Sequence, residues 1–277
     1  MYSHTALKIY AALREDIIKT NAQFWREFSD SSKIEALAIE AENYAQELWD
    51  ANICLSCCFD EDFPALPMSL KSSERPFLFA YKGDFSLLRN PEINVAVVGV
   101  LTPNEEFLIR ERNVIERLVA KGYRVVSGLA IGCDTVAHGT CLEQSGKTIA
   151  FLPSTLTNIY PKQNSSLAKK IMANGGLVIT EYVTEPKNRY ENVKRLIERD
   201  RLQAMFADRI VLIASYRQGN GDSGSRHAMA KAKEYGKERF VMFRAEIDGG
   251  NPMLALNEDL IADGANVITN NVLNSFS

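Results

Sequence analysis

The chain has 277 residues, of which 46% are hydrophobic, 24% charged and 9% aromatic. This composition is that of a globular protein, and it excludes a disordered, collagen-like or coiled-coil chain. No apolar run approaches the ~20 residues that a membrane-spanning helix needs, so no membrane partner is expected. The first residues form an amphipathic segment that contains acidic residues, unlike a secretory signal. Five cysteines are too few for a disulfide framework in a chain of this length. Together these two features predict a cytoplasmic protein.

The net charge of −3 conceals a basic middle segment between two acidic ends. Residues 95–245 hold 23 Lys and Arg against 15 Asp and Glu, a net charge of +8. Residues 1–94 (9 against 15) carry −6, and residues 246–277 (0 against 5) carry −5. An anionic ligand is therefore expected to bind the middle segment, whereas the overall acidity argues against nucleic-acid binding over the whole surface.

Apolar residues at helical spacing, with no Pro or Gly, predict helices over residues 5–50. Residues 53–59 and the segment PFLFAYKGD (76–84) predict two short strands joined by an irregular connector. The chain is accordingly divided into an N-terminal helical region (1–52), a strand-and-loop segment that joins the sheet (53–94) and a Rossmann-like domain (95–277).

From residue 95 onward, apolar strands alternate with helices. Strands are predicted at 95–100, 123–128, 148–153, 177–182, 209–215 and 240–243, and helices at about 104–121, 134–144, from 164, 188–206 and 225–235. Strands that are apolar throughout and alternate with helices predict a mostly parallel sheet covered on both faces, which is a Rossmann-like, doubly wound α/β fold. The tail after residue 249 is expected to add one helix and an edge strand.

In such a sheet, ligands bind beyond the carboxyl ends of the strands, so the loops there are candidate sites. Gly128 and Gly132 lie four residues apart just before a predicted helix, which suits backbone N–H groups aimed at an anion. A tight turn with Asp134 as the N-cap explains the pattern equally well. Lys162 lies close to the next predicted helix start and is a candidate for the same anion, although an exposed loop lysine is the commoner case.

Two further segments allow two interpretations each. Arg195, Arg199 and Arg201 lie within two helical turns, and the first two share a face, where they repel each other unless an anion or an acidic side chain lies between them. The alternative is a solvated helix face with Glu198 and Asp200. The Gly-rich loop 219–226 also precedes a helix and offers donors to an anion, or is a plain connector.

No catalytic, metal or cofactor site is expected. The loop after the strand at 95–100 lacks G-x-G-x-x-G, so a dinucleotide cofactor is not expected, and no Walker A or G-x-S-x-G motif occurs. Ser127, Asp134 and His138 make a poor triad, because Asp134 and His138 lie one turn apart on one helix. The cysteines at 54–58 lack a second ligand pair and fit a buried strand.

Several motifs follow one another in a fixed order. They are D-x-D-F-P-x-L at 60–66, P-F-L-F-A-Y-K-G at 76–83, S-G-L-A-x-G-x-D at 127–134, Y-P-K-x-N at 160–164, T-E-Y at 180–182 and S-G-S at 223–225. In this order and spacing, from about Asp60 to Ala265, the chain resembles the DNA-processing protein A family (DprA, also called Smf). The number of ordered motifs makes the resemblance specific, which no single motif would.

The resemblance implies a dimeric protein that binds single-stranded DNA, mediates recombination by loading RecA and has no enzymatic turnover or cofactor. It implies phosphate contacts from the loop at 127–132 and from Lys162, and the charge of the basic middle segment independently suits sequence-independent binding. The implied DNA-binding residues are Ser127, Gly128, Leu129, Ala130, Gly132, Lys162, Asn164, Arg199, Arg201, Ser223, Gly224 and Ser225. Tyr160 is the nearest candidate for stacking on a base.

Two positions depart from the family pattern. Residues 98–101 read V-G-V-L where the family reads V-G-S-R, and Asp200 stands where the family has the Asn of R-N-R. At ~1–3 kcal/mol for each charge-assisted contact, these changes predict weaker DNA binding. An alternative function is therefore a partner or antitoxin that binds a toxin-like protein in a phage-defence or toxin–antitoxin pair. A nucleotide-derivative sensor or hydrolase is a third, but these loops offer no evident general acid or base.

Overall fold

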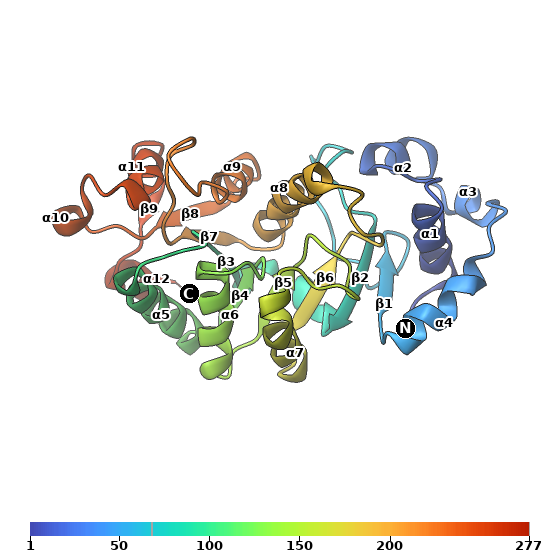
Figure 1. Cartoon of the computed structure of the whole chain (residues 1–277), viewed down its shortest axis with the longest axis horizontal. Helices are drawn as coiled ribbons and strands as arrows, with labels where there is room; N and C mark the ends of the chain where they lie inside the picture. The colour runs from blue at the N-terminus through green and yellow to red at the C-terminus, as the bar shows by residue number, and fades with distance from the viewer. Residues whose placement is uncertain (68, 277) are drawn as a thin grey trace.

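The computed structural model describes residues 1–67 and 69–276. In this part of the chain, nine strands form one sheet in the order β1-β2-β6-β5-β4-β3-β7-β8-β9 (Figure 1). The strands are β1 (Cys54–Cys57), β2 (Leu78–Gly83), β3 (Asn94–Val98), β4 (Arg124–Ser127), β5 (Thr148–Phe151), β6 (Leu177–Thr180), β7 (Arg209–Leu212), β8 (Glu238–Val241) and β9 (Asn266–Val267). The pairings from β6 to β9 are parallel, and β2 pairs antiparallel with both β1 and β6. The predicted doubly wound, mostly parallel α/β fold is therefore confirmed.

The chain reverses its direction of travel across the sheet at β3. From β3 it runs through β4 and β5 to β6, and it then returns past β3 to β7, β8 and β9. The switch point consequently lies between β3 and β7, where the loops after the two strands diverge and open α/β sheets place their ligands. All five residues of β3 are buried, as the continuous apolar run in the sequence predicts.

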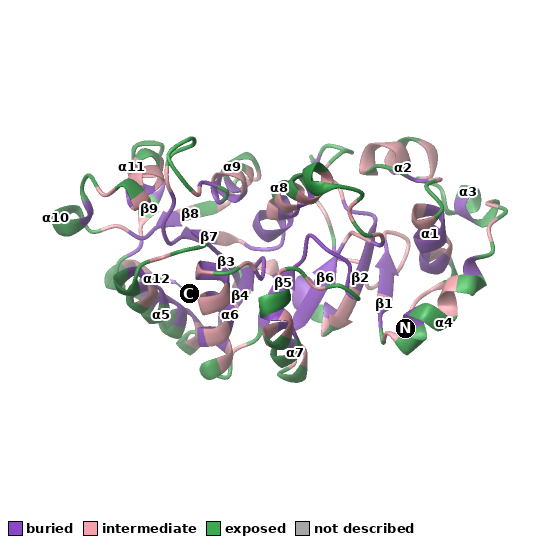
Figure 2. Ribbon diagram, in the orientation of Figure 1, coloured by how far each residue is buried: buried purple, intermediate pink, exposed green. Residues whose placement is uncertain are grey.

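Helices cover both faces of the sheet (Figure 1). One face carries α5 (Glu105–Ala120), α6 (Cys133–Glu143) and α7 (Ser165–Ala173), and the other carries α8 (Arg189–Met205), α9 (Arg226–Glu234) and α11 (Ala255–Ala262). Figure 2 shows the strands buried between these layers and the outer faces of the helices exposed. Short 3₁₀ helices are η1 (Ala41–Tyr44), η2 (Phe85–Leu88), η3 (Pro91–Ile93), η4 (Lys162–Asn164) and η5 (Pro252–Leu254).

The tail contains more helices than the sequence predicts. After residue 249, the described residues form α11 and α12 (Asn270–Ser275), and β9 is the predicted edge strand. The prediction of a single helix there is wrong because the cap of α12 was overlooked: the Thr269 side chain accepts the Val272 N–H. A short helix, α10 (Ala245–Asp248), lies just before the tail and ends at residues 249–252, GGNP.

The N-terminal helices pack onto the β1 end of the sheet (Figure 1). They are α1 (His4–Arg14), α2 (Asn21–Glu27), α3 (Ser31–Glu35) and α4 (Ala45–Asp50), and Ser3, Thr20 and Asp30 cap the first three. Phe24 of α2 stacks on Phe77 with ring centroids 4.0 Å apart. Both rings belong to the hydrophobic cluster that contains Leu152 and Val178, so the helices and the sheet share a core. No helix among the described residues is both long and apolar enough to cross a membrane.

Candidate nucleic-acid interface

The loop after β4 is closed by a carboxylate of its own helix. The N–H groups of Gly128 and Ala130 both donate to Asp134 Oδ2 at 3.1 Å. The residue that caps α6 is Gly132, whose φ is +80° and whose added Cβ would lie 2.4 Å from the Val100 carbonyl oxygen. The interpretation of Asp134 as the N-cap is therefore wrong: it accepts from the loop instead. The N–H groups that sequence reasoning assigned to an anion already have an acceptor.

Asn164 ties the loop after β4 to the loop after β5. Its buried side-chain amide lies 2.9 Å from the Leu129 carbonyl oxygen, 3.0 Å from that of Ala130 and 2.8 Å from Thr135 Oγ1. The amide nitrogen thus donates its hydrogen bonds within the protein, to two backbone carbonyl oxygens and one hydroxyl oxygen. The effect of these bonds is to fix η4, and with it the position of Lys162, against the loop after β4.

Lys162 and Tyr160 are exposed in the segment that follows β5. Tyr160 is 46% exposed, and the exposed Lys162 side chain makes no hydrogen bond or ion pair with any described residue. The Tyr160 N–H donates to Ser154 Oγ at 3.0 Å, so the loop folds back on its own start. This geometry presents an unpaired ammonium group and an aromatic ring two residues apart at the carboxyl edge of the sheet.

Three arginines of α8 are buried, not solvated as one interpretation of the sequence proposed: they are Arg195, Arg199 and Arg201. Arg195 pairs with Glu191 at 2.6 Å. Arg201 makes two bonds of 2.7 Å to the Glu181 carboxylate and one of 2.9 Å to the Glu74 carbonyl oxygen. Acidic partners thus compensate the like charges. The donors of Arg201 are committed to contacts within the protein, on the side of α8 away from Arg199.

Arg199 lies directly behind the loop after β4. A Cβ added to Gly128 would come 1.1 Å from its Nη1, so the glycine leaves the space that the guanidinium occupies. Nη1 is 3.8 Å from Asp134 Oδ2, and Nε is 3.7 Å from Asp200 Oδ1. Burial raises the pKa of Asp200 to about 7. The charge of Arg199 lowers this pKa, whereas the charge of Asp134 raises it further. Arg226 also lowers the Asp200 pKa, so it faces the same cluster.

The loops after β3 and β7 are bound to each other across the switch point. Asp222 Oδ2 accepts the Leu101 N–H at 2.6 Å, and Ser225 Oγ donates to the Gly99 carbonyl oxygen at 2.9 Å. Arg226 Nη1 donates to the Ser223 carbonyl oxygen at 2.9 Å. Asp222 and Arg226 lie in the candidate loop 219–226, but the sequence predicts no separate role for either of them. Both residues flank S-G-S at the switch point, which is the feature that could have indicated them.

The twelve predicted residues differ sharply in exposure. Those that are buried are Ser127, Gly128, Leu129, Asn164, Arg199, Arg201, Ser223 and Ser225; Ala130 and Gly132 are half-buried, and Lys162 and Gly224 are exposed. Among the charged residues of this set, Lys162 alone reaches solvent freely. Direct phosphate contact by the buried members stays a prediction.

The geometry does not support a catalytic triad of Ser127, Asp134 and His138. Ser127 Oγ donates to the Val97 carbonyl oxygen at 2.7 Å, not toward His138. Burial lowers the pKa of His138 to about 3, and its Nδ1 lies 2.7 Å from Thr148 Oγ1. The cysteines at 54–58 lie on or next to β1, and the described residues contain no group of three side chains arranged to hold a metal ion.

Taken together, these features define a Rossmann-like α/β protein whose carboxyl edge carries an unpaired cation and an exposed ring beside closely tied loops. The chain belongs to the family of the DNA recombination-mediator protein A, whose profile matches residues 55–276. It is 33% identical over 197 residues to the DNA processing protein DprA of Streptococcus pneumoniae and 29% identical over 206 residues to that of Bacillus subtilis. The alignments cover 71% and 73% of this chain and 64% of each relative, so the chain spans less than two thirds of either relative's length.

The solved structures similar to this one include two DNA processing proteins. The crystal structure of DprA from Streptococcus pneumoniae has a TM-score of 0.72 at 24% identity and covers 98% of this chain and 93% of that protein, which supports the fold. A structure of DNA processing protein A from Helicobacter pylori, described for its single-stranded DNA binding mode, has a TM-score of 0.64 at 26% identity. It covers 80% of this chain and 94% of that protein.

Proposed function

We propose that the chain is a recombination mediator that binds single-stranded DNA at the carboxyl edge of β4 and β5. The observation that carries the proposal is Lys162, a cation that is exposed, free of partners among the described residues and held in place through Asn164. Membership of the recombination-mediator family and the DNA binding described for the Helicobacter pylori protein support the same conclusion.

The proposed binding is electrostatic and independent of sequence. Lys162 neutralises a backbone phosphate, and Tyr160 offers its ring to a neighbouring base. Arg199 and Arg226 lie deeper and contribute positive potential behind the loop after β4. Neither turnover nor a cofactor is part of the proposal. Assembly as a homodimer and delivery of the strand to RecA follow from the family resemblance and belong to the same proposal.

One observation favours the alternative of a protein partner with reduced DNA binding. Asp134 and Asp222 accept the N–H groups of Gly128, Ala130 and Leu101, which an anion at these loops would otherwise use. Two carboxylates also repel phosphates. If they outweigh Lys162, the fold serves as a surface for a toxin-like protein, and single-stranded DNA does not bind.

The test is fluorescence anisotropy of a labelled oligo-dT strand at low salt. The wild type is expected to bind at micromolar concentration or tighter, and Lys162→Ala to bind about tenfold more weakly, because one charge-assisted contact contributes about 1.5 kcal/mol. The matched control is Lys33→Ala, which removes the same charge from exposed α3 at the far end of the molecule (Figure 1).

Two results would contradict the proposal. One is equal loss of affinity in both variants, which would mean that net charge and not the site matters. The other is no binding by folded wild-type protein at low salt, which would favour the protein-partner alternative and direct the search to proteins encoded by neighbouring genes.

A further inference from the structure

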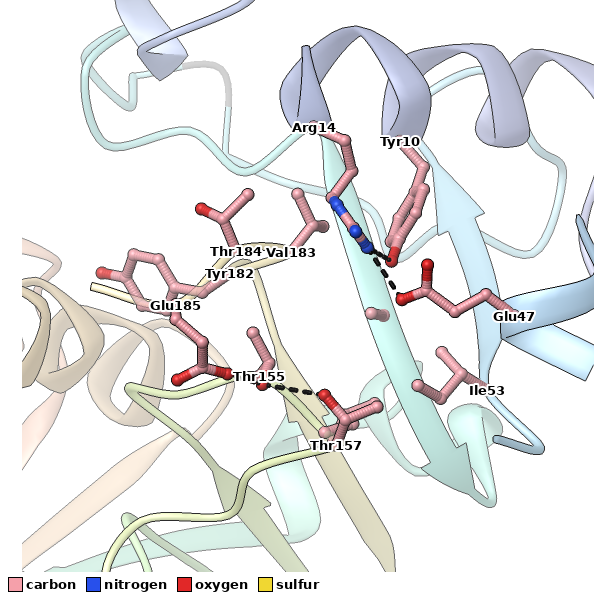
Figure 3. A pocket seen from close by; sticks show the side chains of 12 residues that line it. Tyr10, Arg14, Glu47, Ile53, Thr155, Thr157, Tyr182, Val183, Thr184 and Glu185 are labelled. Carbon is pink, nitrogen blue, oxygen red and sulfur yellow. Dashed lines mark hydrogen bonds and ion pairs between the residues drawn. The ribbon is translucent and has the colours of Figure 1, made fainter. Parts of the chain in front are cut away.

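A cavity of about 220 Å³ lies where the N-terminal helices meet the loops after β5 and β6 (Figure 3). It is smaller than the roughly 300–1,000 Å³ of pockets that enclose drug-sized molecules. Its walls come from α1, α4, β2 and the two loops, so it forms only when the helical region docks on the sheet. None of its polar side chains has a role in the proposed phosphate contacts.

One wall of the cavity carries a guanidinium with unused donors. Arg14 Nη1 donates to the Tyr10 hydroxyl oxygen at 2.9 Å and to Glu47 Oε1 at 2.8 Å, as Figure 3 shows. The guanidinium also lies over the Tyr10 and Tyr44 rings, 5.7 and 5.1 Å from their centroids, which fixes its place. Its Nε and Nη2 have no hydrogen-bond partner among the described residues. Since an arginine has five N–H donors, this wall can donate to a ligand.

The facing wall carries acceptors and hydroxyl groups. Thr155 Oγ1 bonds to Glu185 Oε1 and lies 3.2 Å from Thr157 Oγ1, and Glu185 Oε2 accepts from Asn158 Nδ2 at 3.0 Å. A carboxylate has about four acceptor positions, so Glu185 retains capacity for a further N–H donor. Thr157 and Glu185 are exposed, and the cavity therefore opens to solvent on this side.

Four apolar side chains complete the lining together with Tyr182 and Thr184. Ile53, Ala80, Leu156 and Val183 are buried. The cavity thus suits a small ligand with apolar faces and with donors and acceptors around its edge. A nucleobase has this combination, and proteins that bind unstacked bases read the same edge by hydrogen bonds.

The cavity lies next to the proposed strand-binding loop. The bond between the Tyr160 N–H and Ser154 Oγ brings the exposed tyrosine beside Thr155, which forms the cavity wall, and Lys162 follows two residues later. Lys162 and one wall of the cavity therefore belong to the same segment of chain, between β5 and α7. Access of a bound strand to the cavity rests on the function proposed above, whereas the hydrogen-bonding groups of the cavity do not depend on it.

We propose that the cavity takes one nucleobase with an exocyclic amino group, either an unstacked base of the bound strand or the base of a free nucleotide. The amino group donates to Glu185, and a ring or carbonyl acceptor receives an N–H of Arg14. Cytosine, adenine and guanine carry such an amino group, and thymine does not. The chain is thus inferred to prefer strands that offer an amino-bearing base.

The test compares an all-dT oligonucleotide with the same strand carrying one central dC, dA or dG. The wild type is expected to bind the substituted strands about three- to tenfold more tightly, since one hydrogen bond to a charged group is at stake. In Glu185→Ala, which removes the acceptor, the preference is lost while affinity for all-dT is unchanged. The matched control is Glu116→Ala, which makes the same change on the exposed face of α5 and is expected to keep the preference.

The outcomes separate this inference from the proposed function. Lys162→Ala is expected to weaken binding of all four strands equally, which leaves the preference intact. If no strand binds but free cytidine binds with a dependence on Glu185, the cavity assignment stands and the strand-binding function fails. Equal affinity of the wild type for all four strands without cytidine binding, or a preference that persists in Glu185→Ala, would overturn the assignment.

Discussion

Replacing Asp200 with Asn is expected to stabilise the protein, most strongly above neutral pH. Asp200 and Asp134 face the single guanidinium of Arg199 at 3.7 and 3.8 Å, in a setting where the Asp200 side chain is 14% exposed. Burial raises the pKa of Asp200 to about 7, although Arg199 lowers it, so its ionised form is unfavourable in the folded state. The amide keeps an acceptor for the bond of 3.1 Å from Gln203 Nε2 and carries no charge.

The magnitude follows from proton linkage. A pKa raised from 3.8 to about 7 corresponds to at most about 4 kcal/mol, at about 1.4 kcal/mol for each pH unit. Residual solvation and the contact with Arg199 reduce the expected gain to about 1–3 kcal/mol. The folded protein binds the Asp200 proton more tightly than the unfolded chain does. The contribution of Asp200 to the free energy of unfolding of the wild type therefore decreases as the pH rises from about 4 to about 7, and it is constant above pH 7.

The assay is urea unfolding of the wild type and Asp200→Asn at half-unit steps from pH 4.5 to 8.5. The difference in the free energy of unfolding is expected to grow with pH and to level off near pH 7. The variant is also expected to bind oligo-dT more tightly at pH 8, since a negative charge next to Arg199 is removed. A difference that does not depend on pH, or a variant that is less stable than the wild type at pH 8, would refute the reasoning.

Two further substitutions test the packing and charge of the fold. Gly128→Ala is expected to cost about 3 kcal/mol in urea unfolding because its Cβ displaces the Arg199 guanidinium from buried Asp134 and half-buried Asp200, whereas Gly139→Ala, where nothing lies within 4 Å of the added Cβ, is expected to be neutral or slightly stabilising. Asp248→Asn is expected to cost about 2–4 kcal/mol at pH 7, because Asp248 accepts two bonds from buried Arg110 at 2.7 and 2.8 Å. Burial alone would raise the pKa of Asp248, but the bonds from Arg110 and the Arg244 N–H lower it overall, so the cost should shrink as the pH falls below about 4. An equal effect of the two glycine substitutions, or a cost at Asp248 that does not change in acid, would contradict these accounts.

The fold could be predicted because its strands are patterned simply. The run at 95–100 is apolar throughout, as a strand covered on both faces requires, and β3 has no exposed residue. The positions of the loops at the carboxyl edge follow directly from that alternation of strands and helices. The tail was harder, because Thr269 as a cap is a single polar residue with no periodic signal around it.

The side chains of the site could not be predicted in the same way. Asp134 is suited by type and position to capping a helix, and only the backbone path through Gly128 and Ala130 makes it an acceptor for the loop. Likewise, the charges of Arg199 and Arg201 suggest an exposed face. Their burial depends on acids from distant segments, such as Glu181, which no local pattern places beside them. The cavity between α1 and the loop after β5 has no sequence signal, since it arises from docking.

The most direct test of the central claim is the salt dependence of single-stranded DNA binding. The affinity of the wild type for oligo-dT should fall linearly with salt on logarithmic axes, and Lys162→Ala should show a slope smaller by about 0.7, the value for one phosphate contact on a single strand. This result would establish that Lys162 neutralises a phosphate. Identical slopes for the two proteins, or binding that does not respond to salt, would contradict the account.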